Sequence, residues 1–323
     1  RGRLGSMEST LVWLGAGSDH QDSIMSHSGD SQSCSVVIPA YNADRWIRHT
    51  VESALNQTYP LRQVVIVDDG STDRTADFLS EFGGRILVVR QKNQGVASAR
   101  NAGAALTDST HLAFLDADDE WEPDKIALQM ANFAAEPNLV MVQCGVMEVD
   151  ADGHELSGQV LKGRSGHIYR DLVLQEPVVY GGGSGPVFAR WVFDLVGGFD
   201  PRFSTSADWH LWLRVARHGP VGLVEKQLLR YRIHDSNMHA NVDAERHDML
   251  LGLQEAIAGD PTLSSVSAKA LSRCHRTLAG GYWQHGRYGS SVAQMFAASI
   301  RDPSNVRYFI GKLWRRISRL RRH

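Results

Sequence analysis

The feature that most constrains this chain is a regular alternation of short apolar runs with segments of helical periodicity, between residue 34 and about residue 135. The apolar runs that we expect to be strands are 35–41, 64–67, 86–89 and 111–115. Each is followed by a segment with apolar residues three and four positions apart, which is typical of an amphipathic helix. We therefore expect an α/β fold, in which right-handed crossovers build a mostly parallel sheet with helices on both faces.

The residues around the expected helix starts suggest where these helices begin. Asp44 is a plausible N-cap for the first helix, and Ser71 and Thr72 for the second. Pro123 fits the first position of the helix that follows the fourth strand.

After residue 139 the regular alternation of expected strands and helices ends. The segments that we expect there are a strand and hairpin from 139 to about 166, a flexible or closely packed glycine loop at 181–185, a helix at 208–217, a strand at 221–232 and helices from about 243, including a helical hairpin at 282–303. The expected domain organisation is a disordered, partly tag-derived segment over 1–33, an α/β domain over 34–242 and a helical region over 243–323.

Polar residues, several of them acidic, follow three of the expected strands. Pro39–Asn42 ends the first strand, Asp68 and Asp69 follow the second, and Asp116 and Asp118 follow the fourth. Ligands of open parallel sheets bind beyond the carboxyl ends of the strands, so we expect these residues to share one rim. Clustered carboxylates repel one another unless a cation offsets their charge, and Mg²⁺ or Mn²⁺ suits such oxygen ligands.

Six segments appear in the order of a known family: "SVVIPAYN", "VVIVDDGSTDRT", "NQGVASARNAG", "FLDADDEWEPDKI", "GGFDPRF" and "ADWHLWLRVARHG". Together they resemble the inverting family-2 glycosyltransferases with the GT-A fold, a Rossmann-like domain, over roughly residues 34–240. The resemblance implies a Mn²⁺- or Mg²⁺-dependent enzyme. It would transfer a sugar from a nucleotide diphosphate sugar, most often a UDP-sugar, to an acceptor hydroxyl with inversion.

The resemblance also implies a set of nucleotide-binding residues. Pro39, Tyr41 and Asn42 would line the nucleoside pocket, with the Tyr41 ring beside the base. Asp69 would contact the base, while Arg100 would face the nucleotide or its phosphates. The alternatives are that Tyr41 merely ends a strand, and that Arg100 is an exposed salt-bridging residue.

Metal binding is expected at the Asp-x-Asp. Asp118 is the candidate for direct metal contact, and Asp116 for contact with the ribose or with the metal through water. His234 matches a position where some relatives place a histidine near the metal or diphosphate. Asp119 is a possible helix cap instead.

The catalytic candidate is Asp208, which matches the general base of the family. Here Ala207 replaces the acid that usually precedes it, so the resemblance does not supply the residue that would orient the acceptor. A helix N-cap is the competing interpretation of Asp208. The acceptor-side candidates are Gly183, Ser184 and Trp209, although the glycines also fit a simple turn and the tryptophan a core position.

Charge and cysteines limit other function classes. The 36 acidic and 34 basic residues nearly balance, so nucleic acid is not expected as a partner. The three cysteines, Cys34, Cys144 and Cys274, lack zinc-site spacing and are expected to be reduced core thiols of a cytoplasmic protein.

The basic amphipathic segment 305–323 could bind either an anionic membrane surface or the catalytic domain itself. Peripheral membrane association is therefore considered, together with a carbohydrate or lipid-linked acceptor.

The first strand is followed by "PAYN" rather than a glycine-rich turn, and no Walker A sequence occurs, which disfavours an oxidoreductase and an ATPase. A catalytically silent nucleotide-sugar binder or scaffold remains the alternative, supported by Ala207 alone.

Overall fold

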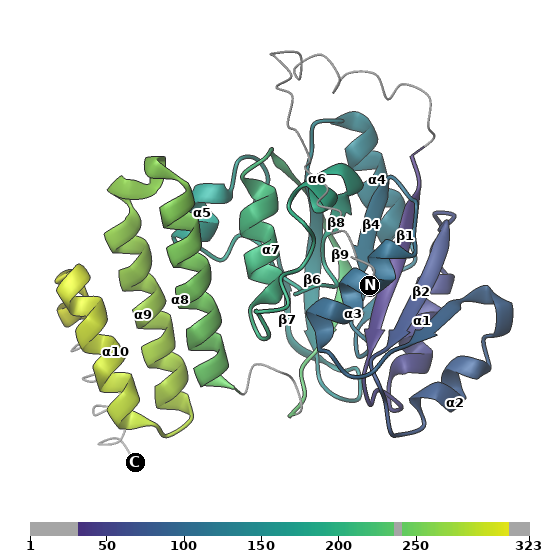
Figure 1. Ribbon diagram of the computed structural model, residues 1–323, viewed down its shortest axis with the longest axis horizontal. Helices are drawn as coiled ribbons and strands as arrows, with labels where there is room; N and C mark the ends of the chain where they lie inside the picture. The colour runs from purple at the N-terminus through teal and green to yellow at the C-terminus, as the bar shows by residue number, and fades with distance from the viewer. Residues whose placement is uncertain (1–31, 236–240, 310–323) are drawn as a thin grey trace, which may run out of the picture. The chain divides into compact units, whose positions relative to one another are not determined.

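The computed structural model describes residues 32–235 and 241–309 (Figure 1). The prediction of a disordered segment over 1–33 falls outside these residues, except for its last two positions. The last part of the basic segment, 310–323, also lies outside them.

The predicted alternation of strands and helices is confirmed. In chain order the first half contains β1 Cys34–Ala40, α1 Ile47–Leu55, β2 Gln63–Asp68, α2 Thr75–Ser80, η1 Gly83–Arg85, β3 Leu87–Arg90, α3 Val96–Ala105, β4 His111–Phe114, β5 Glu120–Trp121 and α4 Lys125–Ala135. Strands β3, β2, β1 and β4 are neighbours in that order and all pair in parallel. The chain therefore leaves β1 toward β2 and later returns to its other side at β4, which opens a crevice at the carboxyl ends of these strands.

The second half continues the same sheet with mixed strand directions. Its elements are β6 Met141–Val149, β7 Glu155–Leu161, α5 Tyr169–Val173, β8 Val187–Ala189, α6 Arg190–Leu195, α7 Ala207–Ala216 and β9 Val221–Arg232. The order continues from β4 through β8, β6 and β9 to β5. β8 pairs antiparallel with β4 and β6, β6 and β9 pair in parallel, and β7 forms the expected hairpin with β6.

Burial explains why these segments form a sheet core. All seven residues of β1 are buried, as expected for a strand covered on both faces. Helix α3 packs closely on β1 and β2 through Gly103, where an added Cβ would lie 2.3 Å from a methyl carbon of Val37. Only glycine permits this approach.

The helix starts differ from the predictions. The N-cap of α1 is Trp46, and the backbone N–H of Asp44 donates to Asp73 instead. Asp73 also accepts from the Thr75 N–H at the start of α2, a role expected for Ser71 or Thr72. Pro123 lies two residues before α4 begins. Neighbouring side chains in the fold decide these details, which local sequence alone does not specify.

The C-terminal region is helical, as predicted. It contains α8 Val242–Gly259, η3 Pro261–Ser265, α9 Ser267–Gln284 and α10 Tyr288–Arg301, with α9 and α10 forming a hairpin. The boundary between the two predicted domains near residue 242 stays a prediction. No helix among the described residues is long and apolar enough to span a bilayer. The three cysteines are buried and unpaired, as predicted.

Candidate active site

One cavity of about 950 Å³ lies at the carboxyl ends of the parallel strands. It joins residues from four distant segments of the chain, including Asp69, Asp118, Asp208 and His234. The register explains this meeting, because Ala40 pairs with Asp68 and Val37 with Phe114, so the residues that follow these strands emerge side by side. The predicted common rim is confirmed.

The segment after β1 forms one end of the cavity. Tyr41 is 53% exposed and lines the cavity, with Pro39 and Asn42 beside it. Asn42 has a left-handed backbone (φ 49°), and its side-chain oxygen accepts from the Thr72 N–H at 2.9 Å. An exposed aromatic ring on a loop fixed in this way leaves one face open to a planar ligand.

Asp69 lies deeper and holds a neighbouring loop. Its carboxylate accepts hydrogen bonds from the backbone N–H groups of Gln94 and Gly95, at 2.9 and 2.8 Å, and from the Gln91 amide. Gly95 is the N-cap of α3. Asp68 accepts from the Ser71 N–H at 2.8 Å and so supports the turn after β2.

Arg100 of α3 is buried and bridges two carboxylates. One terminal nitrogen donates to Asp116 at 2.6 Å and the other to Asp208 at 2.8 Å. Burial alone would lower the pKa of Arg100, but the two carboxylates outweigh it and raise that pKa. Arg100 is therefore neither exposed nor simply directed at phosphates, because it links the Asp-x-Asp with the predicted base.

Asp118 and His234 meet within the same cavity. His234 Nε2 lies 2.8 Å from Asp118 Oδ2, and the His234 ring stacks on Trp46 with centroids 4.4 Å apart. Burial and the nearby Asp116 charge raise the pKa of Asp118, against the opposing effect of His234. A carboxylate with excess negative charge beside a histidine fits the donor set of a divalent cation.

Asp119 and Ser184 lie beneath this rim. Asp119 is fully buried, accepts from the Arg232 N–H at 2.9 Å and contacts the Ser184 hydroxyl. Ser184 Oγ in turn accepts from the Asp116 N–H at 3.0 Å. Asp119 is thus not a helix cap. The Ser184 side chain is buried and engaged with these aspartates, so its position supports a role in holding the Asp-x-Asp rather than in contacting an acceptor.

Asp208 enters the cavity from the first turn of α7. The N-cap of this helix is Ser206, so the alternative of Asp208 as N-cap is wrong. The preceding N–H groups of Ser204, Thr205 and Ser206 all donate to Asp248 of α8, at 2.8 to 3.1 Å. Asp248 therefore fixes the loop that leads into Asp208, a role that no local sequence signal predicts.

The glycine loop at 181–185 is closely packed. An added Cβ at Gly183 would lie 2.4 Å from the Arg100 guanidinium, and one at Gly182 would lie 3.6 Å from Asp208 and 3.8 Å from Asp116. The loop therefore backs the charged bridge at this position. Trp209 lines the same cavity as Asp208, and its acceptor-side role stays a prediction.

Two residues at the end of β9 were not predicted to contribute to this site, and only the first of them lines the cavity. Tyr231 lines the cavity near the carboxylates, and burial together with the Asp119 charge raises its pKa. Arg232 fixes the acidic segment by donating to the Asp118 carbonyl at 2.8 Å and by an ion pair with Glu120. Both end the long strand β9, and their only sequence signal is the strand itself.

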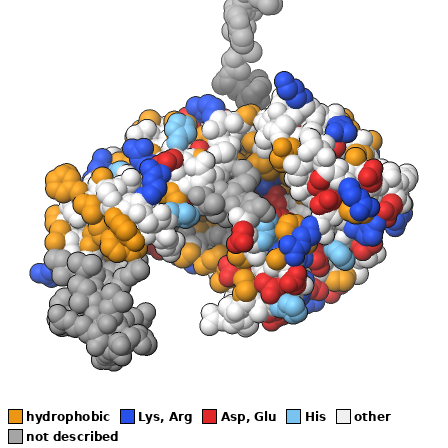
Figure 2. Space-filling view, turned by 90° about the horizontal axis from the view of Figure 1, so that it is seen from below, with side chains coloured by type: hydrophobic (Ala, Val, Ile, Leu, Met, Phe, Trp, Pro, Cys, Tyr) orange, Lys and Arg blue, Asp and Glu red, His pale blue; other side chains and the backbone are white. Residues whose placement is uncertain are grey.

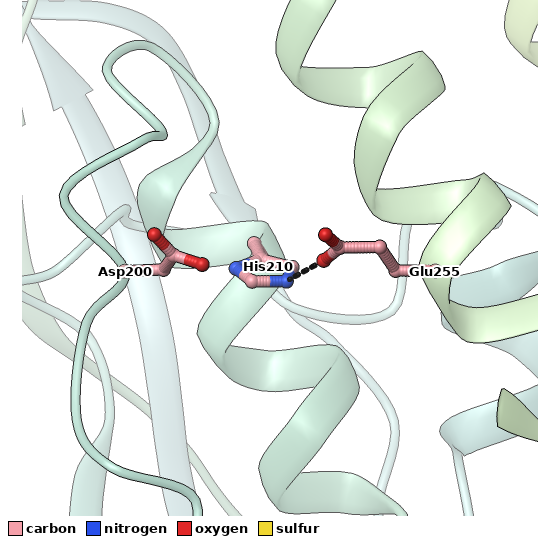
Figure 3. A group of neighbouring side chains, drawn as sticks. All are labelled: Asp200, His210 and Glu255. Carbon is pink, nitrogen blue, oxygen red and sulfur yellow. Dashed lines mark ion pairs between the residues drawn. The ribbon is translucent and has the colours of Figure 1, made fainter.

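A second acidic group, Asp200, His210 and Glu255, lies away from the rim (Figure 3). His210 Nε2 is 3.5 Å from Glu255, and Arg202 pairs with both carboxylates at 2.5 and 2.9 Å. Burial lowers the pKa of His210 to about 4, which keeps the ring neutral. Arg202 already supplies the positive charge here, so this group does not require a metal.

Comparison with known proteins identifies the family. Residues 35–195 match the model of glycosyl transferase family 2. A chondroitin synthase from Escherichia coli is 32% identical over 63% of this chain. The chain spans between 29% and 38% of the length of four curated relatives that it matches, this synthase among them.

Solved structures agree in fold. S. aureus TarS in complex with UDP-GlcNAc superposes with a TM-score of 0.54 at 13% identity, over 84% of this chain and 92% of that one. A mannosyltransferase from Pyrobaculum calidifontis, in complex with GDP-Man and Mn²⁺, gives 0.58 at 18% identity, over 88% and 81%. The expected GT-A-type α/β fold is confirmed.

Proposed function

This chain belongs to glycosyl transferase family 2, and from that premise we propose that it transfers a sugar from a nucleotide diphosphate sugar to an acceptor hydroxyl with inversion. The observation that carries the proposal is the single cavity in which Asp69, Asp118 and Asp208 meet. A cavity of about 950 Å³ is large enough for a nucleotide-sized ligand, and Asp208 is among the residues that line it.

The nucleotide belongs at the end of the cavity formed by Pro39, Tyr41, Asn42 and Asp69. The exposed Tyr41 ring offers a stacking face for the base, and Asp69 an acceptor for its N–H groups. We propose a UDP-sugar as donor, since TarS was solved with UDP-GlcNAc and the relatives include a chondroitin synthase and a hyaluronan synthase.

A divalent cation, Mn²⁺ or Mg²⁺, fits beside the diphosphate. Asp118 and His234 would hold it, with Asp116 contributing directly or through water, because the side chains of Asp118 and His234 meet at 2.8 Å and all three residues line the cavity. A bound divalent ion would neutralise the negative charge that develops on the departing diphosphate. The mannosyltransferase solved with Mn²⁺ supports this choice.

Asp208 acts as the general base in this proposal. Its carboxylate forms an ion pair with Arg100 at 2.8 Å, which fixes its orientation, and it lines the same cavity as Asp118. Deprotonation of the acceptor hydroxyl by Asp208 permits one displacement at the anomeric carbon, and one displacement inverts configuration. Ala207 is buried and offers no second acid, so acceptor orientation depends on other side chains.

The acceptor in this proposal is a carbohydrate, either free or lipid-linked, and the process is the synthesis of a cell-surface polysaccharide or glycoconjugate. The names of the two synthase relatives support this class. Peripheral attachment to an anionic membrane through 305–323 would bring the enzyme to a lipid-linked acceptor.

The direct test is turnover of a panel of UDP- and GDP-sugars with Mn²⁺, with and without a chelator. We expect one donor to be transferred or slowly hydrolysed in a chelator-sensitive manner. Tight donor binding without turnover of any donor, in the presence of oligosaccharide acceptors, would favour the silent binder that Ala207 suggests.

A further inference from the structure

Gln175 has an unusual backbone for its residue type. It follows α5 with a φ of 57°, a left-handed conformation that, apart from glycines, only Asn42 shares among the described residues. The other such residue, Asn42, lies in the nucleotide end of the cavity. Left-handed residues other than glycine and asparagine are rare and concentrate at functional sites.

Contacts on both sides hold this conformation. The Gln175 N–H donates to the Leu172 carbonyl at 3.1 Å. Arg273 of α9 donates to the Leu174 carbonyl at 3.0 Å and pairs with the Glu176 carboxylate, so one arginine fixes both neighbours of Gln175. The strained residue is therefore imposed by the surrounding structure.

The Gln175 side chain lines the cavity, and its amide nitrogen is buried without a hydrogen-bond partner among the described residues. Trp212 also lines the cavity, is 8% exposed and has an equally unpartnered indole nitrogen. Trp209 connects them, since it lies one turn before Trp212 on α7 and its Nε1 lies 3.4 Å from the Leu172 carbonyl of α5.

Two unpartnered buried donors in one cavity indicate a missing ligand, because buried donors without partners are costly. Aromatic rings combined with amide and indole donors suit a sugar ring, which has apolar faces and equatorial hydroxyl oxygens. The nucleotide end, at Tyr41 and Asp69, is formed by different segments.

We propose that Gln175 and Trp212 form, with Trp209, the subsite for the terminal sugar of a carbohydrate acceptor. In it, the Gln175 amide and the Trp212 indole N–H donate to sugar hydroxyls. This inference rests on the proposed glycosyltransferase activity. These three residues would position the acceptor, which is the role that the acid replaced by Ala207 would otherwise have.

The test compares Gln175→Gly and Gln175→Glu with wild type. Glycine removes the amide but suits the left-handed backbone, so the variant should be at least as thermally stable as wild type. Glutamate keeps the size of the side chain but removes the donor. Gln284→Glu, at the exposed end of α9, is the matched control for the added charge.

The probes are p-nitrophenyl β-glycosides of glucuronic acid, N-acetylglucosamine, N-acetylgalactosamine and mannose, measured by ligand-detected NMR with UDP and Mg²⁺ present. We expect at least one glycoside to bind wild type and both Gln175 variants to bind it about tenfold more weakly. UDP affinity and the Gln284→Glu control should be unchanged. The acceptor KM should rise with little change in kcat.

Equal glycoside affinity in the Gln175 variants and in wild type would overturn the inference. It would also be overturned if the wild-type protein bound UDP but none of the glycosides. Failure of the proposed function is distinguishable, because wild type would then either bind neither UDP nor a nucleotide sugar, or bind a nucleotide sugar without turning it over.

Discussion

At the scale of single residues, Asp208 is the group whose replacement separates chemistry from binding. It lies in the first turn of α7, paired with Arg100, while Tyr41 and Asp69, which are proposed to bind the nucleotide, belong to other segments. We expect Asp208→Asn to lower the rate of sugar transfer about 10³-fold and to leave UDP affinity within twofold, about the effect of losing a general base.

The control is Asp194→Asn, an exposed carboxylate of α6 that pairs with Arg190, which should keep full activity. Transfer by Asp208→Asn at more than about a tenth of the wild-type rate would remove Asp208 from the role of base.

Arg100 provides a prediction about stability. Its side chain is 3% exposed between Asp116 and Asp208, so Arg100→Met leaves two carboxylates facing each other without a cation. We expect a loss of about 3 kcal/mol in the free energy of unfolding, measured by urea denaturation.

Adding Asp208→Asn to Arg100→Met should recover part of that loss, since one of the opposed charges is gone. Arg62→Met, whose partner Asp108 is exposed, is the matched control and should cost less than about 1 kcal/mol. Equal costs for Arg62 and Arg100 would contradict the assigned bridge.

His111 is expected to make the free energy of unfolding depend on pH. Burial lowers its pKa from 6.5 to about 4, against the opposing effect of the hydrogen bond with Ser33. The unfolded chain therefore binds a proton between these values that the folded chain does not, so stability is fully present above pH 6.5 and is lost as the pH falls toward 4.

This residue should account for about 2 kcal/mol of the difference in unfolding free energy between pH 7.5 and pH 5. His111→Gln should reduce the pH dependence by that amount, as seen in denaturant titrations at the two pH values. An unchanged slope in the variant would show that His111 does not stay neutral in the fold.

At the scale of elements, the sequence predicts strands and helices well where periodicity is strong. The strands that became β1, β2, β3 and β4, and the helix that became α7, lie within two residues of their predicted bounds. Their apolar spacing is dictated by burial on both faces of the sheet, and this signal is local in the sequence.

Helix ends and polar partners were less predictable, because they depend on contacts between distant segments. The Asp73 carboxylate, rather than Ser71 or Thr72, accepts from the first turn of α2, and Asp248 on α8 fixes the loop before Asp208. The meeting of Asp118 with His234 across 116 positions followed from the family resemblance, whereas Tyr231 and Gln175 carried no signal.

At the scale of the whole molecule, the C-terminal helices carry an unusual apolar surface. Tyr288, Val292, Phe296 and Ile300 recur at every fourth position of α10 and are 55% to 69% exposed. Hydrophobic side chains gather at the left end of Figure 2, where α10 lies. The sequence after residue 309 adds six lysines and arginines and no acid, so an apolar face continues into a basic segment.

Deletion of residues 305–323 tests the proposed membrane contact. We expect the full chain to co-sediment with vesicles that contain phosphatidylglycerol, more weakly at high salt, and the shortened chain to bind them at least about fivefold less. Neutral phosphatidylcholine vesicles are the control. Unchanged sedimentation of the shortened chain with anionic vesicles would dismiss the contact.

The central claim is that aspartates from separate segments share one cavity and bind a nucleotide diphosphate together with a divalent ion. Isothermal titration of UDP into the protein with Mn²⁺, repeated with a chelator and with Asp118→Asn, tests it most directly. We predict binding with Mn²⁺ and a loss of at least about tenfold in affinity in each of the other two cases. UDP binding of equal strength in all three would contradict the account.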